Sequence, residues 1–278
     1  MESRIRLAGH DPARSLVTVP LDEVLACLEE RGPRIALVLL EGVHFLSGRR
    51  TDMARVAEAA RRAGAVVGFD LAHAAGNVPL ALHDWGVDFA VWCSYKYLNS
   101  GPGAIAGCFI HERHGKDSSL PRLAGWWGND PATRFRMHLE STFVPREGAD
   151  GWQISNPPIL AMAPLRASLA IFDEVGMPAL RARSLRLTGH LETLLASIGR
   201  EPFEVVTPAN PEARGCQLSI VVRKDPRRVQ RALEEEGVVC DLREPDILRV
   251  APAPLYSTFA DVRRFAEVLA RQVGVALP

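Results

Sequence analysis

Lys96 is the residue whose type and surroundings point most directly to chemistry. Only three of the thirty-three cationic residues are lysines, Lys96, Lys116 and Lys224, so arginine supplies the positive charge elsewhere. A lysine amine can lose its proton and add to an aldehyde as a Schiff base, whereas a guanidinium stays charged and is not nucleophilic. Tyr95 and Tyr97 flank the lysine. We predict a nucleophilic lysine, against the alternative of a strand residue whose amine only reaches solvent.

Asp70 and His73 form a second candidate pair, in the string Asp70-Leu71-Ala72-His73. Alone, this spacing is typical of a carboxylate that caps a helical turn. An amine and a carboxylate together are what pyridoxal 5'-phosphate (PLP) requires, because the lysine binds its aldehyde and the acid keeps the pyridine nitrogen protonated. The sequence therefore predicts a PLP site. No metal site is predicted, because His111-Glu112-Arg113-His114 fits a solvated loop better.

An α/β pattern must position these groups. The hydrophobic periodicity predicts helices at 21–31 and 51–63, the second with Thr51 as its N-cap, and strands at 35–40, 65–70, 89–93 and 104–110. Strand, helix and strand in close succession indicate a parallel sheet that is buried on both faces. Ligands of such sheets bind beyond the carboxyl ends of the strands, where Asp70, His73, Tyr95 and Lys96 are expected to converge.

The rest of the chain is expected to form an irregular segment, a long helix and a second domain. Residues 111–155 have the composition of a binding or subunit-contact loop, and Asn156-Pro157-Pro158 opens a helix to residue 172 with prolines in its first turn. We expect an α/β PLP-binding large domain at 1–175 and a small α+β domain at 176–278. The second domain is predicted to hold helices at 179–198, 227–236 and from 259, and strands at 203–206, 217–222 and 247–250.

Composition excludes several classes of protein. The 278 residues are 47% hydrophobic, which suffices for a globular core. Thirty-three acids balance thirty-three bases, so no bulk charge attracts nucleic acid or an anionic membrane. Five dispersed cysteines without a Cys-x-x-Cys pair indicate reduced thiols. No apolar run approaches the roughly 20 residues that span a bilayer, and we expect a cytoplasmic location.

Several long motifs resemble those of kynureninase. They are GFDLAHAAGNVPLALHDWGVDFAVWCSYKYLNSGPGAIAGCFIHERH (68–114), GWWGN (125–129), TRFRM (133–137), ISNPPIL (154–160), RGCQLSI (214–220), GVVCDLRE (237–244) and LRVAPAPLY (248–256). The resemblance runs from about residue 20 to about residue 270. It implies the aspartate-aminotransferase fold (fold type I of the PLP enzymes), a homodimer with a composite active site, and hydrolysis of L-kynurenine or 3-hydroxykynurenine to L-alanine and an anthranilate, in tryptophan catabolism and NAD biosynthesis.

The resemblance also implies roles for individual residues. Lys96 would carry the cofactor as a Schiff base, Asp70 would pair with the pyridine nitrogen, and His73 would lie close to the ring. Tyr95 would contact the phosphate and exchange protons during catalysis. The remaining roles fall to residues nearer the C-terminus: Trp126 and Asn156 would reach the cofactor or substrate of the opposite subunit, and Arg249, Asn156 and Ser155 would bind substrate. Their alternatives are a core aromatic for Trp126, a helix N-cap for Asn156 and a solvated strand residue for Arg249.

Two features depart from the family pattern. Glu41 stands where some relatives carry a small hydroxyl residue near the phosphate, and an acid there is expected to repel a dianion unless it points away. The chain also begins downstream of the segment that supplies the aromatic stacked on the pyridine ring and most of the phosphate cradle. We therefore expect that these 278 residues bind PLP weakly, have little or no kynureninase activity and contain a sheet with an open edge. The alternative function is a truncated, non-catalytic family member that only folds or dimerises.

Overall fold

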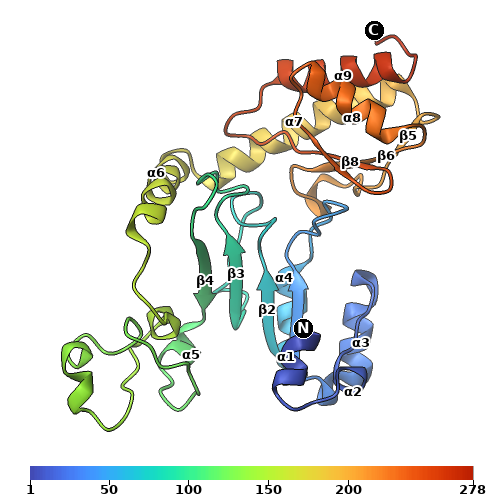
Figure 1. The fold of residues 1–278 in the computed structure, drawn as a ribbon. Coiled ribbons are helices and arrows are strands. Elements are labelled where there is room, and N and C mark those ends of the chain that lie inside the picture. Colours follow the sequence, from blue (N-terminus) through green and yellow to red (C-terminus); the bar gives the residue numbers. More distant parts are fainter. Residues whose placement is uncertain (278) are drawn as a thin grey trace.

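The computed structural model describes residues 1–277 and contains two four-stranded sheets (Figure 1). The first has the order β1-β2-β3-β4, with β1 (Leu37–Glu41), β2 (Val66–Asp70), β3 (Phe89–Cys93) and β4 (Ala106–Ile110). Its first three strands are parallel and β4 is antiparallel to β3. The second sheet is antiparallel and has the order β5-β6-β8-β7, with β5 (Phe203–Val205), β6 (Leu218–Val222), β7 (Asp241–Arg243) and β8 (Ile247–Val250).

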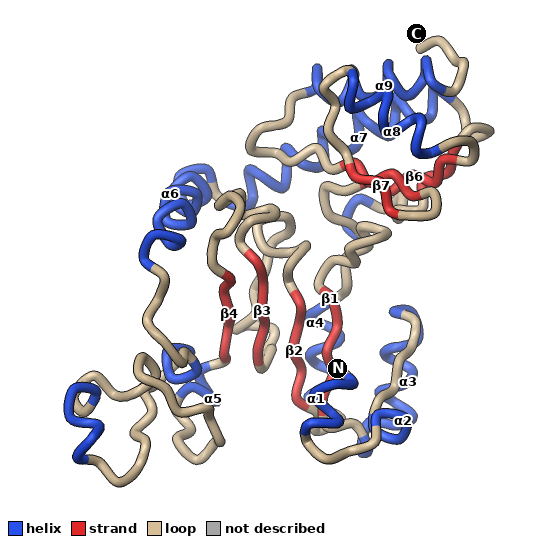
Figure 2. Tube along the Cα trace, in the orientation of Figure 1, coloured by secondary structure: helices blue, strands red, loops and turns tan. Residues whose placement is uncertain are grey.

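Helices pack against each sheet. In the first part of the chain they are α1 (Glu2–Leu7), α2 (Pro12–Ser15), α3 (Val24–Arg31), α4 (Met53–Arg62) and α5 (Glu112–Gly115). In the second part they are α6 (Ile159–Val175), α7 (Met177–Ile198), α8 (Pro226–Glu235) and α9 (Phe259–Gln272). Helices α7, α8 and α9 cover one face of the second sheet (Figure 2) and share one hydrophobic core with it. A separate core joins the first sheet to α3 and α4. The division at residue 175 stays a prediction.

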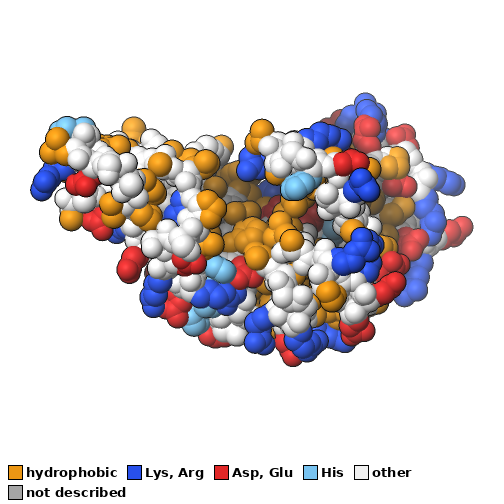
Figure 3. Space-filling view, turned by 90° about the horizontal axis from the view of Figure 1, so that it is seen from below, with side chains coloured by type: hydrophobic (Ala, Val, Ile, Leu, Met, Phe, Trp, Pro, Cys, Tyr) orange, Lys and Arg blue, Asp and Glu red, His pale blue; other side chains and the backbone are white. Residues whose placement is uncertain are grey.

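Within residues 1–277 the first sheet is covered on one face only, so for these residues the expectation of strands buried on both faces is wrong. Val67 and Phe69 of β2 point into the core. Side chains that alternate with core residues lie on the other face, and four of them, Leu37, Leu39, Val66 and Val91, are 38–46% exposed. Helix α4, which connects β1 to β2, and α3, which contacts it, pack in the core on the first face. Seen from below, apolar side chains gather in the hollowed middle of the molecule (Figure 3).

Two helix starts differ from the predictions. Helix α4 is capped by Asp52, whose carboxylate accepts a hydrogen bond from Arg55 N at 3.2 Å, and the Thr51 hydroxyl instead donates to Glu41 O at 2.6 Å. Helix α6 begins at Ile159, so the two prolines precede the helix and Asn156 is not its N-cap. A residue that precedes proline is disfavoured in helical geometry, which pushes both Asn156 and Pro157 out of the helix.

Residues 42–50, the loop between β1 and α4, tie the first sheet to the second. The Ser219 hydroxyl donates to Leu46 O at 2.5 Å, the Thr207 hydroxyl donates to Ser47 O at 2.6 Å, and Gln217 Nε2 donates to Phe45 O at 3.0 Å. Each donor comes from β6 or from the segment just before it. This loop therefore fixes the distance between the two sheets.

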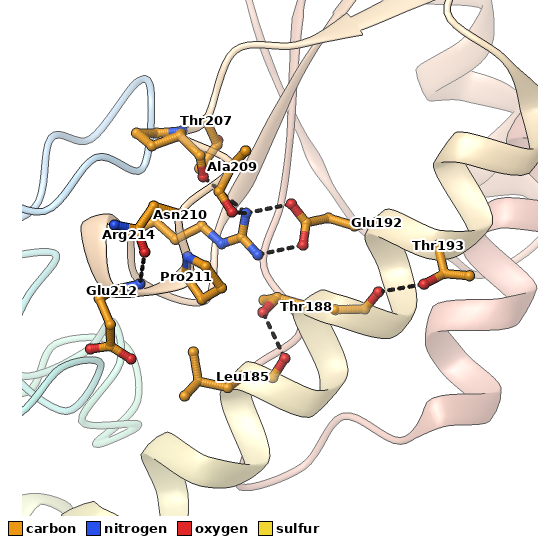
Figure 4. Close-up of polar contacts among 12 residues, drawn as sticks. Leu185, Thr188, Glu192, Thr193, Thr207, Ala209, Asn210, Pro211, Glu212 and Arg214 are labelled. Atoms are coloured by element: carbon orange, nitrogen blue, oxygen red, sulfur yellow. Dashed lines mark hydrogen bonds and ion pairs between the residues drawn. The ribbon is translucent and has the colours of Figure 1, made fainter.

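Arg214, in the segment before β6, is fully buried and forms a bidentate ion pair with Glu192 of α7 (Figure 4). Its Nη1 and Nη2 atoms lie 2.5 and 2.6 Å from the two carboxylate oxygens, and Nη1 also donates to Pro208 O at 2.9 Å. The pair anchors residues 207–214 to α7. Because Cys216 N, two residues on, donates to Asn77 Oδ1 of the first part at 2.9 Å, the same anchor also places the second sheet against the first.

Candidate active site

A cleft of about 820 Å³ opens between the carboxyl ends of β2 and β3 and the strands β7 and β8. Asp70, His73, Tyr95 and Lys96 all line it, as the expected convergence at one sheet edge requires. Residues of the second sheet, from the far end of the sequence, form the opposite wall. The other lining residues include Glu41 at the end of β1, Val43 and Phe45 of the loop that follows it, and, on the opposite wall, Gln217, Val239, Cys240, Asp241, Arg243, Arg249, Ala251 and Tyr256.

Lys96 and His73 are in direct contact, with Lys96 Nζ 3.1 Å from His73 Nε2. The pKa of His73 is lowered to about 4, first by burial and then by the charges of Lys96 and Arg249, so the imidazole is neutral at neutral pH. We assign the donor role in this contact to the Lys96 amine, so Nε2 accepts and the ring proton is placed on Nδ1. His73 Nδ1 is buried and has no hydrogen-bond partner among the described residues.

The lowered pKa of His73 predicts a loss of stability in acid. The unfolded chain takes up a proton near pH 6.5 and the folded chain only near pH 4, so the free energy of unfolding falls as the pH drops through this window. Urea titrations at pH 7 and pH 4 give the drop in the free energy of unfolding between the two pH values. This drop is expected to be about 1 to 3 kcal/mol smaller for His73→Gln than for the wild type. His10→Gln, at an exposed histidine, is the control and should behave as the wild type. Equal losses in all three proteins would contradict the prediction.

Asp70 and Tyr95 present their polar atoms differently. Asp70 is exposed at the end of β2, and its Oδ1 accepts a hydrogen bond from Ala72 N at 2.8 Å. Tyr95 is also exposed, and the pKa of its phenol is raised, chiefly by a hydrogen bond with Cys93. A phenol with a raised pKa is protonated at neutral pH and can donate.

Arg249 is not a solvated strand residue. Its Nε donates to Asp241 Oδ2 at 2.7 Å and its Nη1 donates to Phe45 O at 2.8 Å. Asp241 and its neighbour Arg243 were not singled out from the sequence, because the three-residue strand β7 was not predicted. The signal that could have found them is the alternation Asp241-Leu242-Arg243, which places both charges on one face of a strand.

Glu41 lies in the cleft and does not point away from it. Its carboxylate accepts a hydrogen bond from Phe45 N at 3.0 Å. The acid therefore holds the loop that carries Phe45, whose ring centroid is 6.5 Å from that of His73. This gives Glu41 a structural partner at the position where the sequence suggested a conflict with phosphate.

Trp126, Ser155 and Asn156 do not line this cleft. Trp126 packs edge-on against Phe135, with ring centroids 5.3 Å apart, and Ser155 and Asn156 are exposed ahead of α6. The segment that contains Trp126 lies at the end of the first sheet remote from the second sheet (Figure 1). Within one protomer these residues are separated from Lys96, and their roles stay predictions.

The residues of the cleft fit the cofactor that the sequence predicts. PLP is an aromatic aldehyde with an anionic group. The amine of Lys96 matches the aldehyde, and the two arginines, Arg243 and Arg249, match the anionic group. The carboxylate of Asp70 and the unpartnered, buried Nδ1 of His73 are further polar groups for the ring. Within residues 1–277 no group of three or more His, Cys, Asp or Glu side chains is arranged to hold a metal ion. The same residues contain no helix long and apolar enough to cross a membrane.

Sequence comparison finds kynureninases. Residues 180–269 match the kynureninase C-terminal domain. The chain is 53% identical over 279 residues to the kynureninase of Xanthomonas euvesicatoria and 52% identical over 279 residues to that of Xanthomonas axonopodis. In both cases the match covers 96% of this chain and 65% of the relative. The chain thus spans about 65% of the length of these relatives, and the resemblance predicted from the motifs is confirmed.

Structure comparison confirms the fold. A cysteine desulfurase from Thermococcus onnurineus matches with a TM-score of 0.75 and 17% identity, over 90% of this chain and 63% of that one. Alanine-glyoxylate aminotransferase from Nostoc matches with a TM-score of 0.69 and 24% identity, over 92% and 65% of the two chains. These enzymes have the predicted α/β fold, fold type I of the PLP-dependent enzymes.

Proposed function

We propose that this chain, a homologue of curated kynureninases over 96% of its own length, acts as a PLP-dependent hydrolase that cleaves a carbon-carbon bond of L-kynurenine or 3-hydroxykynurenine. The products would be L-alanine and anthranilate or 3-hydroxyanthranilate, in tryptophan catabolism. The observation that carries the proposal is the contact of Lys96 with a neutral His73 in a cleft that also holds Asp70 and Arg249. The non-catalytic alternative is not favoured, because Lys96, His73, Asp70 and Arg249 share one cleft and the relatives at 53% identity are kynureninases.

Each end of the ligands has a matching group in the cleft. Lys96 would hold PLP through its amine, and Asp70 would accept a hydrogen bond from the pyridine nitrogen. Arg249 would bind the carboxylate of the substrate, for which a guanidinium fork is well suited. PLP supplies an electron-accepting ring that stabilises the charge left on the substrate when a bond to it breaks.

The protein's own groups would move the protons. Lys96 Nζ can remove and return the proton at the α-carbon, and His73 Nε2, 3.1 Å away, accepts a hydrogen bond from the amine and orients it. The phenol of Tyr95, whose pKa is raised chiefly by a hydrogen bond with Cys93, is protonated at neutral pH and can donate a proton to the fragment that leaves. These roles assign the base and the acid to neighbouring residues with different environments.

A homodimer in the cytoplasm is part of the proposal. Trp126, Ser155 and Asn156 lie outside the cleft of their own chain, which supports their reaching the cleft of a second copy. The large domain would comprise residues 1–175 and the small domain residues 176–278, with the cleft between them. Release of fluorescent anthranilate from kynurenine by the PLP-saturated protein tests the activity. No release at saturating PLP would contradict it.

Arg249→Ala is expected to raise KM for kynurenine roughly 30-fold or more, which corresponds to about 2 kcal/mol or more for a desolvated ion pair. The carboxylate is bound in both the ground state and the transition state, so kcat should change less than KM. Steady-state kinetics check this. Arg227→Ala removes an exposed arginine of α8 that pairs with Glu244 and is the control. An unchanged KM in an active Arg249→Ala enzyme would contradict the assignment.

A further inference from the structure

Asp241 lines the cleft but has no part in the function proposed above, and Arg243 has so far been matched only to the anionic group of the cofactor. Asp241 stands opposite Arg249 in the antiparallel register of β7 and β8. A single oxygen, Asp241 Oδ2, lies 2.7 Å from Arg249 Nε, 2.5 Å from Arg249 Nη2 and 2.9 Å from Arg243 Nε. One carboxylate is thus shared between two arginines.

Arg249 has little surface left for a ligand. Its side chain is 12% exposed, whereas those of Asp241 and Arg243 are 47% and 49% exposed. Nη1 is already engaged by Phe45 O at 2.8 Å. A carboxylate that enters the cleft therefore approaches the guanidinium through the position that Asp241 holds. While Asp241 stays there, it both blocks the guanidinium and repels the incoming charge.

We propose that the Asp241 carboxylate occupies the binding position of the substrate carboxylate in the free protein, where it pairs with Arg249. When the carboxylate of an amino-acid substrate binds Arg249, the Asp241 carboxylate pairs with Arg243 instead. The inference rests on the proposed function, which assigns the substrate carboxylate to Arg249. Arg243 already contacts Oδ2, so Asp241 remains paired throughout the exchange and no carboxylate is left without a cation.

The exchange also gives selectivity. A ligand with a carboxylate replaces the ion pair of Arg249 with an equivalent one, because charge and hydrogen bonds are both restored. A ligand without a carboxylate forms no new ion pair with Arg249 to replace the one that Asp241 makes. Asp241 therefore acts as a positioning residue that reserves Arg249 for carboxylates.

The test measures the equilibrium binding of L-alanine to the PLP-loaded protein, with absorbance as the readout. L-Alanine carries the carboxylate and is not cleaved. Asp241→Asn keeps the side-chain shape and removes the competing charge, so the Kd of L-alanine is expected to fall about tenfold, a change of about 1.4 kcal/mol. The Kd of ethylamine, which lacks the carboxylate, should not change. A weaker or unchanged Kd of L-alanine, or equal tightening of both ligands, would overturn the inference.

Arg243→Gln provides a second, independent variant. Without Arg243, Asp241 has only Arg249 as a partner, so the Kd of L-alanine should rise several-fold, on the order of 3- to 10-fold. In the Asp241→Asn background the same substitution should have no effect. An equal loss in both backgrounds would mean that Arg243 contacts the ligand itself, and would overturn the exchange.

Arg249→Ala separates this inference from the proposed function. If Arg249→Ala weakens L-alanine binding while Asp241→Asn does not strengthen it, the carboxylate assignment stands and only the exchange fails. If Arg249→Ala leaves the Kd of L-alanine unchanged, the assignment of Arg249 fails and the exchange fails with it.

Discussion

Replacement of Lys96 by arginine is expected to abolish anthranilate release from kynurenine, a fall of at least roughly 10²- to 10⁴-fold in kcat. Arginine keeps the positive charge beside His73 but has no nucleophilic amine and does not lose its proton at neutral pH. Both the attachment of the cofactor and the proton transfer at the α-carbon would therefore be lost. Measurable turnover by Lys96→Arg close to that of the wild type would contradict the assignment.

The small number of lysines makes this prediction specific. Lys116 and Lys224 are the other two lysines of the chain, and Lys116→Arg and Lys224→Arg should keep full activity. A measurement independent of turnover is reduction with borohydride in the presence of PLP, followed by peptide mapping. The pyridoxyl label is expected on Lys96. A label on either of the other lysines in place of Lys96 would show that Lys96 does not hold the cofactor.

Glu192→Ala is expected to lower the free energy of unfolding by roughly 2 to 4 kcal/mol. Arg214 is fully buried, and without Glu192 its charge keeps only backbone carbonyl partners such as Pro208 O. An uncompensated buried charge is strongly destabilising. Because the pair anchors the segment that leads into β6, the second sheet should loosen first, which urea denaturation followed by tryptophan fluorescence and far-UV circular dichroism can measure.

Two further variants control for the effect of charge alone. Glu204→Ala breaks the exposed pair with Arg223, whose atoms are 3.5 Å apart, and should cost less than about 1 kcal/mol. The double variant Glu192→Leu with Arg214→Met removes both charges and should recover part of the stability lost in Glu192→Ala. A cost for Glu192→Ala no larger than that for Glu204→Ala would show that the buried pair contributes little.

The elements themselves could be predicted from the sequence because their signals are local. The strands β3 and β8 have the predicted bounds. The bounds of β1, β2 and β4 each differ from the predicted ones by two residues or fewer. Hydrophobic runs of strand length and helical periodicity depend only on neighbouring residues. Strand β7 was missed because its three residues, of which Asp241 and Arg243 are charged, form no hydrophobic run, and their alternation is too short to stand out. The starts of α4 and α6 were displaced by a competing cap and by successive prolines.

The candidate site shows the same division. Residues at the carboxyl ends of β2 and β3, Asp70, His73 and Lys96, could be grouped from the sequence, because parallel strands end at one edge of a sheet. The kynureninase motifs could likewise be read without a structure. The opposite wall could not, because Arg249 and Asp241 are more than 140 residues away from Lys96 in the sequence. They reach the cleft through contacts between the two sheets, such as those of residues 42–50 and of Asn77 with the segment that leads into β6.

What the sequence by itself determined was the set of reactive groups and the order of the elements that carry them. Only the tertiary structure decided which charges face one another: that His73 contacts Lys96 and becomes neutral, that Arg249 is covered by Asp241, and that one face of the first sheet is exposed. The physical reason is that pKa shifts and ion pairs depend on distance and desolvation, and both are set by packing between segments far apart in the chain.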